Sequence, residues 1–131
     1  MDNQTAFNLV WERAKDQRKA TVRIPDTYDS GGSCVYRSPN GLKCFAGVLI
    51  PDELYQPTFE NTVISGLVEN KSQDRDRPFP PEDIQPLQAH LADCSTRLLD
   101  RFQTIHDSYE VSEWESRLMD LAREFNLSVP A

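Results

Sequence analysis

Cys44 is the residue whose type and position offer the clearest opportunity for chemistry in this sequence. It follows the turn-forming run 38–41 and directly precedes the apolar run 45–50. If a helix begins here, its dipole would lower the pKa of the thiol and favour the nucleophilic thiolate. His106 and Asp107 come later in the chain and could supply a general base and the group that orients it. One interpretation is therefore a cysteine-dependent enzyme with these three residues at its centre.

The same residues also have a structural interpretation, which we favour. Cysteine is among the residue types that are most often buried, and the residues after Cys44, FAGVLI, are apolar enough to belong to a core. A histidine in the last turn of a helix, as we expect for His106, can bond to the terminal carbonyl groups and complement the helix dipole. Whether the chain is an enzyme therefore stays open.

A zinc site is a second chemical possibility. His90 and Cys94 are four residues apart, so their side chains would share one face of a helix. With Cys34 and Cys44 they would complete the three thiolates and one imidazole of a structural zinc site. Cys34 and Cys44, however, are farther apart than the cysteine pairs of zinc knuckles, and Cys94 lies on an apolar stripe. We therefore expect reduced thiols and no metal or cofactor.

The formal net charge is −7, and the acidic residues are concentrated in the second part of the chain. Residues 1–50 contain seven Lys or Arg and five Asp or Glu, whereas residues 51–131 contain seven and sixteen. Such a surface disfavours direct binding to nucleic acid, because that binding depends on basic groups that displace counterions from phosphates. It would suit a basic protein partner, although acidic helices also simply keep a small protein soluble.

The localisation signals are few. The longest apolar run, 45–50, is far shorter than the roughly 18 residues that a membrane span needs. The N-terminal residues lack the basic start and apolar centre of a secretory signal. Three cysteines, an odd number, fit reduced thiols. These features predict a cytoplasmic protein without a membrane association.

The elements that would position these residues are mostly helices. Apolar residues at helical spacing predict five of them, over residues 4–20, 43–50, 58–70, 82–106 and 112–126. Two β-prone runs around a turn-rich segment predict one small antiparallel hairpin near residues 21–37. The expected fold class is therefore mainly α (α+β), a compact helical domain over residues 1–131 with one β-hairpin.

A polar, proline-rich run, KSQDRDRPFPP, predicts an exposed loop over residues 71–81. Phe79 within it is a candidate contact for a partner protein. Trp114 on the last apolar stripe, and Lys43 and Tyr55 near the central turn, are further candidates for such contacts.

The central stretch CVYRSPNGLKCFAGVLIPDELY resembles a family of small uncharacterised proteins of bacteriophages, prophages and bacteria. Their pattern reads C-x-Y-R-x-P-x-G-L-K-C-A-x-G-x-L-I-P-D-x-x-Y, followed by a His-Asp pair and a tryptophan at the start of the last helix. The matching residues are Cys34, Gly41, Leu42, Lys43, Cys44, Gly47, Ile50, Pro51, Asp52, Tyr55, His106, Asp107 and Trp114. Phe45 replaces the family's usual alanine, and Asn61 stands where glycine is expected. The resemblance implies a shared fold and an accessory role, without a defined activity.

The sequence therefore predicts a small, soluble, non-enzymatic accessory protein, encoded by a phage or mobile element and located in the bacterial cytoplasm. It would act on a protein partner, such as a host or defence factor, through an acidic helical surface. Two alternatives stay open. One is the enzyme that uses Cys44 and His106, and the other is a structural or assembly subunit of a virion that forms homo-oligomers.

Overall fold

The computed structural model of the protein describes residues 1–17, 36–37, 42–60, 63–69 and 79–130. This part contains five α-helices: α1 (Asn3–Gln17), α2 (Ile64–Glu69), α3 (Pro81–Leu91), α4 (Thr96–Ser108) and α5 (Trp114–Glu124). It also contains three single turns of 3-10 helix: η1 (Gly47–Leu49), η2 (Pro57–Phe59) and η3 (Val111–Glu113). The predicted mainly helical class is confirmed.

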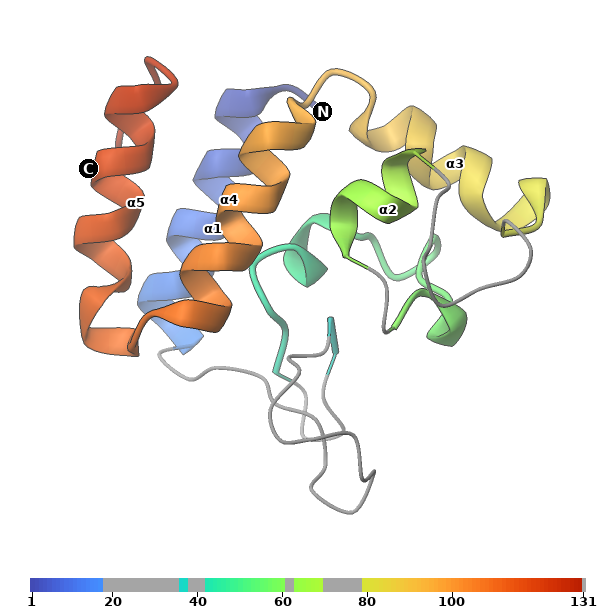
Figure 1. Ribbon diagram of the computed structural model, residues 1–131, viewed down its shortest axis with the longest axis horizontal. Coiled ribbons are helices and arrows are strands. Elements are labelled where there is room, and N and C mark those ends of the chain that lie inside the picture. Colours follow the sequence, from blue (N-terminus) through green and yellow to red (C-terminus); the bar gives the residue numbers. More distant parts are fainter. Residues whose placement is uncertain (18–35, 38–41, 61–62, 70–78, 131) are drawn as a thin grey trace.

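The helices pack in two groups that share one core. Helices α1, α4 and α5 lie side by side, and α2 and α3 lie on the other side of α4 from α5 (Figure 1). The turn η1 packs against α1. Buried apolar side chains from all five helices, η1 and η2 form a single cluster. In the described part of the chain, no helix is long and apolar enough to cross a membrane.

Helix α1 forms as its apolar spacing predicts. Phe7, Val10 and Ala14 are buried along one face. The Asp2 carboxylate accepts the Thr5 N–H at 2.8 Å, as expected of a residue that caps a helix start. This hydrogen bond lowers the pKa of Asp2, because it favours the charged carboxylate.

The predicted long helix over residues 82–106 is wrong, because the chain breaks into α3 and α4. Ser95 is extended at the break, and its Oγ accepts the Leu98 N–H at 3.4 Å, which starts α4. The Ser95 N–H is donated to Asn3 Oδ1 at 2.7 Å. The apolar residues at helical spacing in this region are nevertheless all buried in the core: Leu87, Leu91, Cys94, Leu98, Phe102 and Ile105.

The segment 43–50 is buried as predicted, but it forms only the single turn η1 instead of a helix. The Cys44 N–H is donated to Tyr36 O at 3.3 Å, so the chain here pairs with a neighbouring segment before it turns. Ile50 is extended and ends the turn directly before Pro51, as the steric restriction before proline requires.

Gly47 makes this turn possible. A Cβ atom placed on Gly47 would overlap the backbone carbonyl of Tyr36. The backbone at Gly47 therefore lies closer to the backbone at Tyr36 than a residue with a side chain would allow.

We predict that Gly47→Ala destabilises the protein by about 1–3 kcal/mol or more, because the backbone contact with Tyr36 must open. Urea unfolding followed by circular dichroism would measure the change. An unchanged free energy of unfolding would contradict the close approach described here.

The predicted hairpin near residues 21–37 falls almost entirely outside the described residues, as does most of the predicted loop 71–81. Within the described ranges the chain has no strand, and the isolated antiparallel bridge between Arg37 and Lys43 is what pairs there. The hairpin is therefore not supported by the described part of the fold.

The last helix starts differently from the prediction. The helix was predicted from residue 112, but a capping box between Glu110 and Glu113 first opens η3, and α5 begins directly after it. Trp114, the first residue of α5, is buried in the core.

The end of α5 follows the prediction. Asn126 has a φ of 56°, the left-handed conformation expected of a helix cap. The Leu127 N–H is donated to Ala122 O at 2.8 Å, which completes the Schellman pattern. Beyond it, the Gln4 side chain accepts the Ser128 N–H at 2.8 Å and donates to Ser128 O at 2.9 Å. The C-terminal segment is thereby fixed along α1.

Candidate functional site

Cys44, the predicted nucleophile, lies in the core. The residue is 2% exposed, and its Sγ accepts the Gly47 N–H at 3.2 Å. Burial raises the pKa of Cys44 to about 12, which outweighs the lowering by this hydrogen bond. The predicted lowering of the Cys44 pKa by a helix dipole is therefore wrong, because η1 is a single turn and the thiol faces apolar side chains.

His106, the predicted base, is also buried. Its side chain has 0% exposure, and its Nδ1 lies 2.9 Å from Asp107 Oδ1. The ring lies 5.2 Å from the Phe45 ring and 5.3 Å from the Trp114 ring, measured between centroids. Phe45 and Trp114 are in turn 4.7 Å apart, edge to face. His106 and Asp107 thus come together as predicted, but as part of a packed aromatic cluster.

This arrangement is suited to folding rather than to catalysis by Cys44. A nucleophile needs access to a substrate and a thiolate at neutral pH, and the buried thiol has neither. The structural interpretation of the central stretch is the one that these contacts favour.

We predict that iodoacetamide at neutral pH leaves Cys44 unmodified in the folded protein. With a pKa of about 12, roughly one Cys44 thiol in 10⁵ would be ionised at pH 7, even without its burial. Cys94, whose pKa is raised by burial to about 11, should also resist. Peptide mapping by mass spectrometry would locate the label.

The matched control is the same protein in urea, in which both thiols should react at the rate of an ordinary cysteine. Rapid labelling of Cys44 in the folded protein would restore the enzyme interpretation.

The predicted zinc ligands do not share a helix face. His90 is in the last turn of α3, whereas Cys94 follows the end of that helix and is buried in the core. Cys44 and Cys94 are both free thiols, and Cys34 lies outside the described residues. Among the residues that the structure describes, no three histidine, cysteine or acidic side chains are placed to hold a metal ion.

Two of the predicted partner contacts are buried. Trp114 is 1% exposed and Phe79 is 2% exposed. The Phe79 ring packs edge to face on Phe59 at 5.6 Å between centroids. Neither aromatic side chain is therefore available at the surface for the predicted partner contact, because both are buried in the core.

Lys43 and Tyr55, the other two predicted contacts, belong to a polar cluster that the sequence did not reveal. Arg37 is central to it: its Nη2 lies 2.8 Å from Asp52 Oδ1, and its guanidinium lies 4.4 Å from the centre of the Tyr55 ring. Lys43 Nζ lies 3.6 Å from the same Asp52 oxygen. The Tyr55 hydroxyl donates to Glu60 Oε2 at 2.6 Å.

Glu60 extends this cluster to the backbone. Its carboxylate accepts the N–H groups of Tyr36 and Arg37 at 2.9 and 3.3 Å. The cluster therefore ties residues 36–37 to the segment after η1. The only sequence signal for it was the set of charged residues within the resembling motif.

We predict that Asp52 makes stability depend on acid pH. The Arg37 guanidinium, and next the Lys43 ammonium, hold the pKa of Asp52 below its ordinary value. Because the folded-state pKa is lowered, the stabilisation is present above the unfolded pKa of about 4 and is lost as the pH falls through the folded value. Asp52→Asn should therefore be less stable than the wild type near pH 7, with a difference that shrinks below about pH 4.

Urea unfolding at several pH values would measure this difference. Glu53→Gln is the matched control, since Glu53 is an exposed neighbour without an ion pair in the described part of the chain. A gap that stays constant with pH for Asp52→Asn would contradict the ion pair's role.

Helices α4 and α5 present the clearest surface feature among the described residues. All four of their arginines are in ion pairs with nearby acids: Arg97 and Arg101 with Glu124, Arg117 with Glu113, and Arg123 with Asp120. Three other exposed carboxylates on the two helices and their connection have no ion pair in the described part of the chain. We call these the acidic face: Asp100, Glu110 and Glu115.

No family model, curated protein or solved structure matches this chain. The resemblance to small phage and bacterial proteins stays a prediction, and its residues Arg37, Gly47 and Asp52 have the structural uses described above.

Proposed function

We propose that the protein is a small, non-enzymatic accessory protein that binds a basic protein partner through the acidic face of α4 and α5. The observation that carries this proposal is the pairing of every arginine on these helices, which leaves the acidic face with uncompensated negative charge. Complementary charge accelerates association and selects against acidic partners.

The burial of Cys44 supports a binding role over the enzyme alternative, because a shielded thiol has no contact with a substrate. The virion-subunit alternative would use exposed apolar surface. The large apolar side chains exposed in the described part, Leu9, Val63, Met119 and Val129, are dispersed over α1, the start of α2, α5 and the C-terminal segment. We place the protein, in keeping with the resemblance, among phage or mobile-element products that act on a factor in the bacterial cytoplasm.

The test is affinity capture from a bacterial lysate with the intact protein and with Asp100→Asn/Glu115→Gln. Neither carboxylate bonds to another described side chain, so the variant should fold normally. We expect the wild type to retain a basic protein, and the variant to bind it about tenfold more weakly. Raising the salt concentration to about 1 M should release the partner, because salt screens exposed charges.

The matched control is Glu53→Gln/Asp93→Asn, which removes the same amount of charge outside α4 and α5 and should bind like the wild type. Retention of an acidic partner, or equal retention by both double variants, would refute the acidic face as the binding surface.

A further inference from the structure

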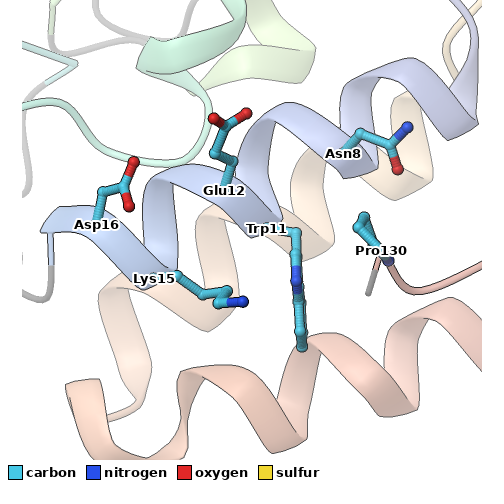
Figure 2. Close-up of a pocket in the computed structure, with 6 residues that line it drawn as sticks. All are labelled: Asn8, Trp11, Glu12, Lys15, Asp16 and Pro130. Carbon is cyan, nitrogen blue, oxygen red and sulfur yellow. The ribbon is translucent and has the colours of Figure 1, made fainter.

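Residues 128–130 follow the cap of α5 and lie along α1, and we call them the strap. At the far end of the strap, Pro130 borders a groove of about 350 Å³. The other residues that line this groove belong to α1: Asn8, Trp11, Glu12, Lys15 and Asp16. Figure 2 shows the Trp11 side chain reaching from α1 toward α5, with Pro130 beside it. The strap therefore closes one end of the groove.

A single side chain holds the strap. Gln4 Oε1 accepts the Ser128 N–H at 2.8 Å, and Gln4 Nε2 donates to Ser128 O at 2.9 Å. In the described part of the chain, residues 128–130 form no other hydrogen bond, and Pro130 has no N–H to donate. Both bonds depend on the orientation of one amide group, so a rotation of the Gln4 side chain breaks them together. The strap is therefore attached to α1, or detached from it, as a unit.

The orientation of this amide is linked to the groove. The Gln4 Nε2 atom has two hydrogens, and it donates the second to Asn8 Oδ1 at 2.8 Å. This bond places Gln4 Nε2 and Oε1 opposite the Ser128 groups that complement them. Because Asn8 also lines the groove, the residue that orients Gln4 is in contact with whatever the groove contains.

The strap has little other contact to hold it closed. Ser128 is exposed and Val129 is 38% exposed, and one side of Pro130 faces the groove. Leu127, by contrast, packs against the core and its N–H is donated to Ala122 O at 2.8 Å. Exposed segments with few buried contacts open at a much smaller free energy than the whole fold. The chain can therefore open after Leu127 while the cap of α5 stays intact.

We propose that the strap is a gate on the groove and that Gln4 is its latch. In the closed state, which the structure shows, Gln4 holds Ser128 and Trp11 is only 8% exposed. In the open state, Gln4 releases Ser128, Pro130 leaves the edge of the groove, and the Trp11 side chain becomes more exposed. The gate shares no residue with the acidic face, so the two proposals stand or fall separately.

Amide hydrogen exchange, followed by NMR on the intact ¹⁵N-labelled protein, tests the gate. We expect the Ser128 N–H to exchange faster than the Leu127 N–H, and at a rate that low urea concentrations leave unchanged, because a local opening exposes little surface. Gln4→Ala should accelerate exchange at Ser128 about tenfold or more, because both hydrogen bonds are lost. Exchange at Leu127 should stay the same.

Two further variants sharpen this measurement. Gln4→Glu should give an intermediate rate at Ser128, because a carboxylate still accepts the N–H but cannot donate to Ser128 O. Gln85→Ala is the matched control, since Gln85 is an exposed glutamine of α3 whose side chain has no hydrogen bond in the described part of the chain. It should leave the Ser128 rate unchanged.

The exposure of Trp11 is an independent readout. Quenching of tryptophan fluorescence by acrylamide should be stronger in Gln4→Ala than in the wild type. In a Trp11→Phe background the same change should have no effect, because the remaining Trp114 is buried away from the strap. Exchange of Ser128 only together with the core amides, equal Ser128 rates in Gln4→Ala and the wild type, or unchanged quenching would overturn the proposal.

Discussion

The close contact between Gly47 and the Tyr36 backbone is the constraint on which the central part of this structure depends. It lets the chain fold back within a single turn, and that turn carries Phe45 into the space beside α4 and α5. The Phe45 ring then touches both His106 and Trp114, one from each helix. Because η1 also packs on α1, this close backbone contact affects how α1, α4 and α5 pack around the central turn.

The residue types that first suggested catalysis serve this packing. A buried histidine is costly unless its nitrogen atoms have partners, and the exposed Asp107 carboxylate provides one of them at 2.9 Å. The imidazole ring also stacks on Trp114 with an interplanar angle of 25°. A cysteine, a histidine and an aspartate in a suggestive order can therefore be explained by the demands of a core that contains a few polar groups.

Features set by local spacing could be predicted from the sequence. The buried faces of α1 and α5 follow the apolar period, and the left-handed Asn126 follows from residue type alone. The break between α3 and α4 could not be predicted in this way, because the buried stripe continues through it. The break is stabilised by a hydrogen bond from Ser95 to Asn3, and these residues are 92 positions apart.

The candidate sites, too, could be predicted only where local sequence determines them. The burial of Cys44 could be predicted from the apolar residues that follow it in the sequence. The polar cluster around Arg37 and the groove beside Pro130 depend on segments that meet only in the folded chain. Asp52, in the first of these, looks like an ordinary surface acid until its neighbours Arg37 and Lys43 in the folded chain are known.

The pairing of Gln4 with Ser128 has a consequence for folding during synthesis. These residues are 124 positions apart, so the C-terminal segment that packs beside α1 is synthesised long after α1 itself. Until then its apolar face has only η1 and the other early segments to cover it. During synthesis, α1 would therefore be made before the other described helices and would be among the last of them to be fully covered, with its apolar face exposed until α5 and the C-terminal segment are available.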